Sequence, residues 1–143
     1  MSIALITQDR SAANVISCDA STPMREAVKL LAEKRIGALP VMRGGSVVGI
    51  FSERDVIYRL AQEGEICLDR PLSEVMTAPP ITVDTSTLVD DALALMTRRR
   101  IRHLPVIEGG SMVAFISIGD LVKHRIDQVE HEAEAMRIYI QTA

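Results

Sequence analysis

An internal repeat constrains the fold of this chain more than any other feature of its sequence. Displaced by 65 positions, residues 16–61 align with residues 81–126 without a gap, and the two segments are identical at 17 of 46 positions. Unrelated segments of average composition would share roughly 3 identities over that length. The identities keep a proline and two glycines at fixed offsets, in Leu-Pro-Val and Gly-Gly-Ser. Each copy is therefore one structural unit.

The pattern within each copy predicts a βαββα unit. A short extended segment, at 15–18 and at 81–83, precedes an Asp-x-Ser-Thr turn whose threonines, Thr22 and Thr87, are candidate helix N-caps. A helix with an apolar stripe follows. Two short apolar strands come next, joined by a Gly-Gly hairpin, because glycine accepts the positive φ of tight hairpins. Pro40 near the start of its strand favours a position at a sheet edge or strand end.

One such unit is too small to bury its sheet face alone. The predicted fold class is therefore α+β, with two βαββα repeats packed about a pseudo-twofold axis. The predicted organisation is a first repeat at 9–61, a connector at 62–80, a second repeat at 81–126 and a C-terminal amphipathic helix at 127–143.

The C-terminal segment carries an apolar stripe with spacings of three and four residues: Ile126, Val129, Ala133, Met136 and Ile140. Such a stripe needs a partner, and two remain open. It packs either on the core of this chain or on a second subunit.

Composition limits the function classes. The net charge of −3 argues against non-specific nucleic-acid binding, which requires a basic surface. No apolar run is long enough for a membrane span, and the N-terminus lacks the pattern of a secretory signal. Cys18 and Cys67 have no metal-ligand spacing, and we expect two buried thiols in a cytoplasmic protein.

Several short motifs together resemble one known family. Ile-Gly-Ala-Leu-Pro-Val at 36–41 is followed by Gly-Ile-Phe-Ser-Glu-Arg-Asp at 49–55, and counterparts stand at 101–106 and 114–120. Val-Met-Thr at 75–77 precedes the second copy. The sequence resembles a tandem pair of CBS domains, the regulatory module named after cystathionine β-synthase and also called a Bateman-type module. It looks most like the bacterial stand-alone pairs.

This resemblance implies a cleft between the repeats with two pseudo-symmetric adenosyl sites, each built from both repeats. The aspartate of each Ser-x-x-Asp segment is expected to hold the ribose hydroxyls, and the serine and nearby basic residues to hold phosphate. The implied contacts of the first site are Ser52, Arg54, Asp55, Ile81, Arg102 and His103. Those of the second site are Ile16, Gly37, Ala38, Ser117 and Asp120, with Ile36 beside them among the nucleotide-binding residues.

The chemistry of the Ser-x-x-Asp segments agrees with this assignment. Each lies between a strand and a helix, and a helix N-terminus presents free N–H groups and partial positive charge to a phosphate. A carboxylate such as that of Asp55 repels phosphate but accepts two hydrogen bonds from a vicinal diol. The alternative is that Ser52 and Ser117 act only as N-caps, with the aspartates complementing the helix dipole.

The two sites differ in charge. Arg54 has Gly119 as its counterpart, and Arg102-His103 has Gly37-Ala38. Guanidinium groups bind phosphate in bidentate fashion, so we predict that the first site takes the phosphate-rich ligand. The second site is left to a less charged adenosyl group, the far half of a dinucleotide, or nothing.

The predicted function is that of a regulatory module sensing energy or redox state through an adenine nucleotide. AMP or NAD(H) is favoured, with ADP and ATP as further candidates. The alternatives are an S-adenosylmethionine binder or a protein-interaction adaptor with vestigial sites. An enzyme is disfavoured, because no catalytic motif or metal-ligand cluster occurs in the sequence. The expected partners are a second copy in a homodimer and an effector protein, without nucleic acid or membrane.

Overall fold

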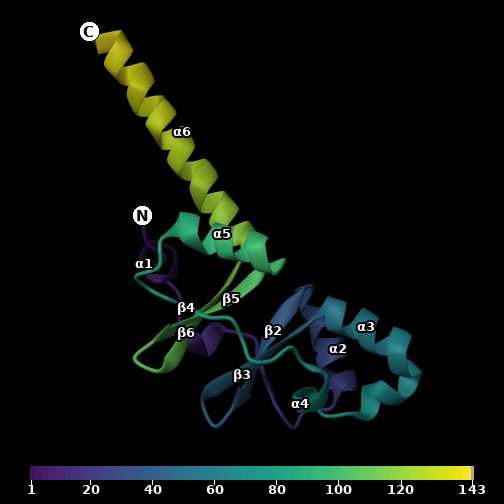
Figure 1. Ribbon diagram of the computed structural model, residues 1–143. Helices are drawn as coiled ribbons and strands as arrows, with labels where there is room; N and C mark the ends of the chain where they lie inside the picture. Colours follow the sequence, from purple (N-terminus) through teal and green to yellow (C-terminus); the bar gives the residue numbers. More distant parts are fainter. Residues whose placement is uncertain (143) are drawn as a thin grey trace.

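The computed structural model describes residues 1–142, so only the last position of the predicted segment 127–143 lies outside the described residues. Two three-stranded sheets, each with its own helices, lie against one another (Figure 1). The first half of the chain contains, in order, α1 (Ala4–Thr7), the 3-10 turn η1 (Ala12–Asn14), β1 (Cys18–Asp19), α2 (Met24–Lys34), β2 (Ala38–Arg43), β3 (Ser46–Ser52), α3 (Glu53–Glu63), η2 (Gly64–Asp69) and α4 (Leu72–Val75). The second half contains β4 (Val83–Asp84), α5 (Val89–Arg99), β5 (His103–Glu108), β6 (Ser111–Ser117) and α6 (Ile118–Thr142).

The two sheets have the same topology, which confirms the predicted α+β fold with two βαββα repeats. In each, a short first strand runs parallel to the middle strand, and the middle strand pairs antiparallel with the third. Both middle strands carry a register shift at the same place, between Val41 and Met42 and between Val106 and Ile107. The hairpin glycines adopt the expected positive φ, +57° and +83° at Gly44 and Gly45 in the first repeat.

The edge position expected for Pro40 is wrong, because β2 is the central strand of its sheet. The missing amide donor is tolerated for a geometric reason. Pro40 stands opposite Ile50, whose N–H and C=O both bond to Thr77 on the far side of β3 rather than to β2. The Pro40 nitrogen therefore faces β1, and β1 pairs only with Val41 and Met42.

The threonine N-caps are also wrong. Helix α2 begins at Met24 after Pro23, and α5 begins at Val89 after Leu88. Asp19 accepts a hydrogen bond from the Ser21 amide at 2.9 Å, forming the expected turn. The Thr22 carbonyl accepts a bond from the Leu72 amide, and the helix starts only after Pro23, whose backbone is extended.

The segment described as a connector contributes to the first repeat's core. Cys67, Leu72 and Val75 are buried there, and Cys67 is a free thiol, as is the partly buried Cys18. The N-terminus does the same for the second repeat: Ile3 is completely buried and donates its amide to the Thr87 carbonyl.

The segments that begin at Ile3 and Leu72, here called the docking segments, are structural counterparts. They are 69 positions apart in the sequence, whereas equivalent residues of the two repeats are 65 positions apart. The amide of Leu72 bonds to Thr22, and that of Ile3 bonds to Thr87, 65 residues beyond Thr22. The repeat therefore extends backward on both sides, with four additional residues between the docking segment and the first strand of copy one. Because of this insertion, a gapless alignment does not detect that the two docking segments are equivalent.

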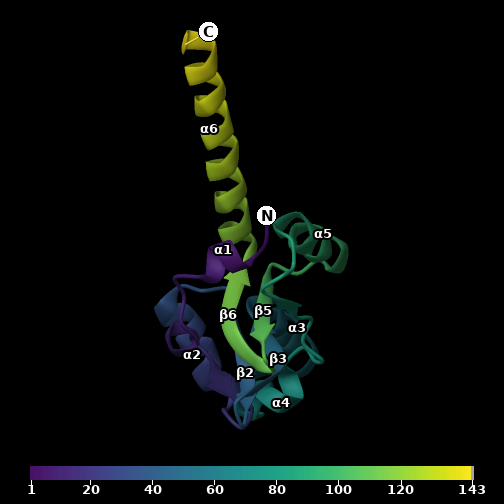
Figure 2. The ribbon, with the colours of Figure 1, turned by 90° about the vertical axis from the view of Figure 1, so that its left-hand side faces the viewer.

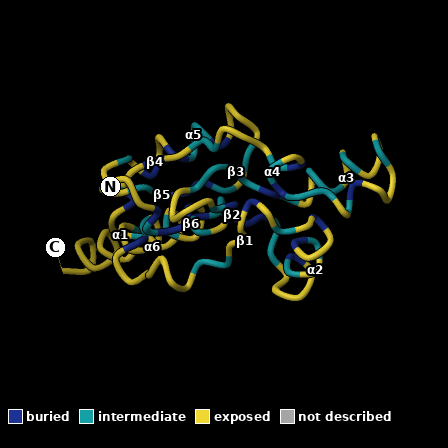
Figure 3. Tube along the Cα trace, turned by 90° about the horizontal axis from the view of Figure 1, so that it is seen from below, coloured by how far each residue is buried: buried dark blue, intermediate teal, exposed yellow. Residues whose placement is uncertain are grey.

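Helix α6 is one continuous helix from Ile118 to Thr142, so the second helix of repeat two and the predicted C-terminal helix are not separate elements. Its first turns pack on the second repeat, and the remainder projects from the body (Figures 1 and 2). The burial-coloured trace shows that this projecting part is almost entirely exposed (Figure 3). Its apolar stripe is therefore not covered by the core of this chain. No helix within residues 1–142 has the length and apolar character needed to cross a membrane.

Candidate functional site

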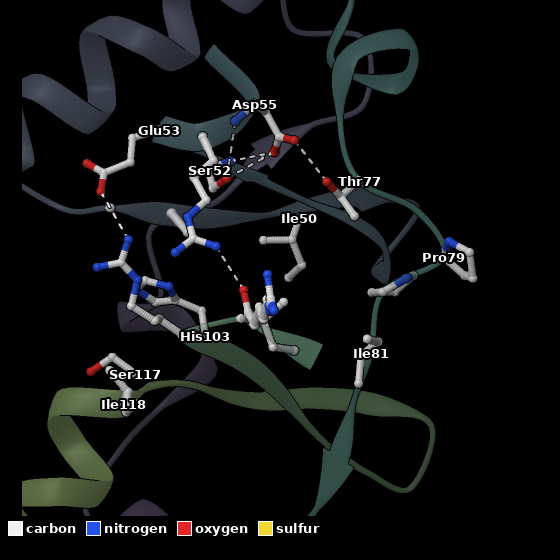
Figure 4. Close-up of a pocket in the computed structure, with 17 residues that line it drawn as sticks. Ile50, Ser52, Glu53, Asp55, Thr77, Pro79, Ile81, His103, Ser117 and Ile118 are labelled. Carbon is white, nitrogen blue, oxygen red and sulfur yellow. Dashed lines mark hydrogen bonds and ion pairs between the residues drawn. The ribbon is translucent and has the colours of Figure 1, made fainter. Parts of the chain in front are cut away.

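A cavity of about 300 Å³ lies between the two repeats (Figure 4). Its walls come from three parts of the chain: the loop and strand ends around β2 and β3, the linker into β4, and the loop before β5 with the start of α6. The lining residues are Gly37, Ala38, Ile50, Ser52, Glu53, Arg54, Asp55, Thr77, Pro79, Pro80, Ile81, Arg100, Ile101, Arg102, His103, Ser117 and Ile118. The structure thus brings together all six residues expected for the first site.

On the first repeat's side, Ser52 and Asp55 form a capping box at the start of α3. The Ser52 amide donates to Asp55 Oδ2 at 2.8 Å, and the Asp55 amide donates to Ser52 Oγ at 3.4 Å. Thr77 Oγ1 donates to the other carboxylate oxygen, Oδ1, at 2.9 Å (Figure 4). The capping role weighed from the sequence is therefore present. Asp55 Oδ2 also accepts a bond from the Ser52 hydroxyl at 3.2 Å, whereas Oδ1 accepts only from Thr77 and retains acceptor capacity for a ribose hydroxyl.

On the second repeat's side, the loop before β5 is fixed by its backbone. The Ile118 amide donates to the Arg102 carbonyl at 2.8 Å, and the counterpart bond runs from the Glu53 amide to the Gly37 carbonyl at 3.0 Å. The two loops thus have the same support. What differs is the side chain, which is a guanidinium at Arg102 and a hydrogen at Gly37.

Arginines from both repeats meet in this cavity. Arg54 Nη1 donates to the Arg100 carbonyl at 2.9 Å, which joins the repeats across the opening. Arg102 Nη2 lies 3.8 Å from a Glu53 carboxylate oxygen. Arg35 and Arg100 both end a helix in the left-handed conformation, but only Arg100 lines a described cavity.

The charge of the cavity is positive on balance. Its charged lining residues are three arginines and two carboxylates, those of Glu53 and Asp55. Glu53 was not anticipated from the sequence, although it stands inside the Ser-Glu-Arg-Asp segment. A surplus of guanidinium charge favours an anionic ligand.

The linker wall was also missed. The amide of Ile50 bonds to the Thr77 carbonyl at 3.0 Å, and the Thr77 amide returns a bond to the Ile50 carbonyl at 2.9 Å. This pairing brings Thr77, Pro79 and Pro80 to the cavity, beside Ile81. The Val-Met-Thr segment was the available signal, since it was noted as a family feature without a role.

A second cavity, of about 340 Å³, lies on the pseudo-symmetric side. Its lining residues are Asp9, Arg10, Ser11, Asn14, Val15, Ile16, Ile36, Ala38, His103, Ala114, Phe115 and Ser117. Of the residues expected for the second site, Gly37 lines the first cavity instead. Asp120 adjoins the second cavity through its partner Arg10.

Asp120 is the counterpart of Asp55, and it also forms a capping box with its serine, Ser117. Its second interaction differs, because the Arg10 guanidinium forms an ion pair with it at 2.9 Å. Burial raises the pKa of Asp120, but the hydrogen bonds from Arg10 and Ser117 outweigh burial and hold the pKa below its ordinary value. Arg10 lies in the segment 8–15, which is four residues longer than its counterpart before the second copy and falls outside the gapless alignment.

His103 separates the two cavities and lines both. Its ring stacks on Phe115, with centroids 5.4 Å apart and an interplanar angle of 13°. Burial lowers the pKa of His103, and the neighbouring positive charge of Arg102 lowers it further, while Asp120 and Glu53 act in the opposite direction. The lowered pKa of His103 favours the neutral imidazole.

Among residues 1–142 no group of three or more His, Cys, Asp or Glu side chains is arranged to hold a metal ion. The two cavities offer hydrogen-bonding groups, guanidinium groups and aliphatic walls.

Comparison with known proteins places these features in one family. The sequence model of the CBS domain matches the chain twice, at residues 10–62 and 72–127. A relative in Arabidopsis thaliana, the mitochondrial CBS domain-containing protein CBSX3, is 33% identical over 129 residues, which is 87% of this chain. The matched region covers 63% of that relative's own length.

Solved structures share the architecture. A CBS-domain protein from Burkholderia ambifaria superposes with a TM-score of 0.80 at 36% identity, covering 89% of this chain and 95% of the other. CBSX2, solved in complex with AMP, has a TM-score of 0.73 at 25% identity, covering 87% and 97%. The CBS pair of MJ0100, solved with 5′-methylthioadenosine and S-adenosyl-L-methionine, has a TM-score of 0.75 at 23% identity, covering 90% and 98%, which supports the fold alone.

Proposed function

This chain belongs to the CBS-domain family as a tandem pair, and from that premise we propose that it is a regulatory module for a phosphate-bearing adenosyl ligand, AMP or NAD(H) foremost. The ligand occupies the cavity between the repeats that contains Ser52, Asp55 and Arg102. Occupancy reports the energy or redox state to an effector protein.

One observation carries this proposal: the cavity joins a diol acceptor from one repeat with guanidinium groups from both. Asp55 is held in place by Ser52 and Thr77, so its carboxylate is oriented without the ligand. Arg102 reaches the same cavity from the loop before β5. A ribose and a phosphate on one molecule match these two groups.

The charge balance argues for a phosphate over a sulfonium. S-adenosylmethionine carries a cationic sulfur, which three lining arginines repel. AMP presents a dianionic phosphate that a guanidinium binds in bidentate fashion. The solved complex of CBSX2 with AMP shows that a protein of this fold takes such a ligand.

We do not assign the phosphate group of the ligand to the second cavity. Its candidate ribose acceptor, Asp120, is already paired with Arg10, and that pair neutralises both charges. We therefore assign one phosphate-bearing ligand to each chain, in the first cavity. The adenosine half of a dinucleotide is the ligand that the second cavity suits.

Titration calorimetry of the full chain against AMP, NAD⁺, NADH, ATP and S-adenosylmethionine tests the proposal. We expect saturable binding of AMP or NAD(H), one molecule per chain, and a raised melting temperature in the same buffer. Chromatography of the recovered nucleotide should show it unchanged. Absence of binding across the panel would favour the adaptor alternative, and a converted nucleotide would favour an enzyme.

A further inference from the structure

Glu53 faces the guanidinium of Arg102, which belongs to the other repeat. One of its carboxylate oxygens lies 3.8 Å from Arg102 Nη2, and both side chains line the first cavity (Figure 4). Glu53 is the first residue of α3, directly after Ser52. Its counterpart in the second repeat is Ile118, so the second copy has no carboxylate at this position.

The backbone determines where the Glu53 carboxylate lies. The Glu53 amide donates to the Gly37 carbonyl at 3.0 Å, which joins the first turn of α3 to the loop before β2. Gly37 has no side chain, and the Glu53 carboxylate lies in the space beside it. A Cβ added at Gly37 would be 3.8 Å from both Glu53 Cδ and Glu53 Oε1. The carboxylate therefore extends past Gly37 toward the second repeat.

The ion pair between Glu53 and Arg102 is weaker than the contact that a phosphate offers. Its length of 3.8 Å is too great for a hydrogen bond, and the two side chains are 62% and 52% exposed. Ion pairs so open to solvent contribute little. A phosphate accepts two charge-assisted hydrogen bonds from one guanidinium. A ligand phosphate therefore competes with Glu53 for Arg102 and has the advantage.

We propose that Glu53 limits how much negative charge the first cavity accepts. This inference deepens the proposed function and rests on it, because it concerns the same cavity and the same class of ligand. The carboxylate repels the phosphate that displaces it, and the repulsion grows with the charge of the ligand. AMP has one phosphate and NAD(H) a diester diphosphate, whereas ATP has a longer and more strongly charged chain. Glu53 therefore selects AMP or NAD(H) over ATP.

The alternative is that Glu53 only complements the dipole of α3. An acidic residue in the first turn stabilises a helix, and Asp55 is a second such residue in α3. This alternative predicts a small loss of stability when the charge of Glu53 is removed, without a change in the choice of ligand. Ligand selectivity is therefore the measurement that separates the two explanations.

Calorimetric titration of the full chain with adenosine, AMP and ATP, in buffer without Mg²⁺, tests the proposal. Glu53→Gln preserves the size of the side chain and removes its charge. We expect this variant to bind AMP about two- to fivefold more tightly than the wild type, the range that corresponds to an exposed ion pair. The gain for ATP should be larger. Adenosine has no phosphate and should bind equally to both proteins.

Glu108→Gln is the matched control. It removes the same charge from an exposed position at the opposite end of β5 from His103, outside both cavities. All three affinities should equal those of the wild type. Thermal unfolding of the ligand-free proteins establishes that both variants are folded.

The outcomes distinguish this inference from the proposed function. If the ratio of ATP affinity to AMP affinity is the same in Glu53→Gln and in the wild type, the inference is overturned and the nucleotide site stands. If neither protein binds AMP, the proposed function is overturned, and the inference with it. Binding of AMP by Glu53→Gln alone would support the inference and contradict the proposed function of the wild type.

Discussion

Arg10 forms an ion pair with Asp120, 2.9 Å between Nη2 and Oδ1, where the first repeat has the hydrogen bond from Thr77 to Asp55. The two aspartates are counterparts in the repeat, and both cap a helix. Their other partners come from different places, Thr77 from the linker and Arg10 from the segment 8–15, which is four residues longer in the first copy. The pseudo-symmetry of the scaffold is thus broken at the groups expected to bind ribose.

Arg10→Ala should lower the free energy of unfolding by about 0.5–1 kcal/mol at pH 7, because the pair is partly exposed and screened by solvent. The pKa of Asp120 is held below its ordinary value. Its contribution is therefore present above the unfolded carboxyl pKa and is lost as pH falls through the lower folded value. Urea unfolding should show the wild type and Arg10→Ala converging at acidic pH.

Arg25→Ala is the matched control for this experiment. Arg25 pairs with Asp69 at 3.4 Å, and both side chains are largely exposed, so its removal should leave stability unchanged. Equal losses in the two variants would show that the position of Arg10 at the second cavity has no special energetic role.

Arg102→Ala should weaken AMP binding by about 10- to 100-fold, the effect of removing one hydrogen bond to a charged group. Arg99→Ala is the matched control, because it removes the same charge three positions earlier, at the exposed end of α5 and outside both cavities. Calorimetry should find that Arg99→Ala binds AMP with an affinity near that of the wild type. Unchanged affinity in Arg102→Ala would contradict the assignment of the phosphate to the first cavity.

His103 should make stability fall on mild acidification. Burial, followed by the charge of Arg102, holds the pKa of His103 below its ordinary value of about 6.5. As pH falls below that value, the unfolded chain takes up a proton that the folded chain resists, so folding becomes less favourable.

Urea titrations between neutral pH and the carboxyl range measure this slope. His103→Ala, which introduces the residue found at the counterpart position 38, should flatten it. His131→Ala, at an exposed position of α6, should retain it. A wild-type slope preserved in His103→Ala would assign the effect to other groups.

Gly49→Ala should destabilise the first repeat by about 1–3 kcal/mol through overpacking. A Cβ at Gly49 would lie 2.9 Å from Met76 Cγ and 2.9 Å from the Thr77 carbonyl oxygen. The second repeat has a buried alanine at the counterpart position, Ala114, where the docking segment carries the smaller Thr7 in place of Met76.

Adding Met76→Ala to Gly49→Ala should therefore recover part of the loss, while the contact with the Thr77 backbone persists. Thermal unfolding of both single variants and the double variant gives the coupling energy. Strictly additive losses would show that Met76 is not the obstacle.

Features with local causes could be predicted from the sequence. The Gly-Gly hairpins, the capping aspartates and the strand pair around Leu-Pro-Val depend on residues a few positions apart, so the pattern of one copy is sufficient to recognise them. The threonine N-caps were wrong because a distant segment competed: the Leu72 amide binds the Thr22 carbonyl, which an N-cap would use to accept the first bond of its helix. The edge position of Pro40 was wrong because the length of β1, a tertiary property, decides which amides are needed.

By itself, the sequence of this protein determined a pair of equivalent βαββα units and the positions where their charges differ, because the two copies can be aligned directly with each other. Only the tertiary structure decided that Arg10 reaches Asp120, that Glu53 and Thr77 enter the first cavity, and that α6 leaves the body with its apolar stripe uncovered. These contacts join segments separated by long stretches of chain or by an insertion. Their formation depends on how two packed cores orient the loops between them, and local sequence does not encode that orientation.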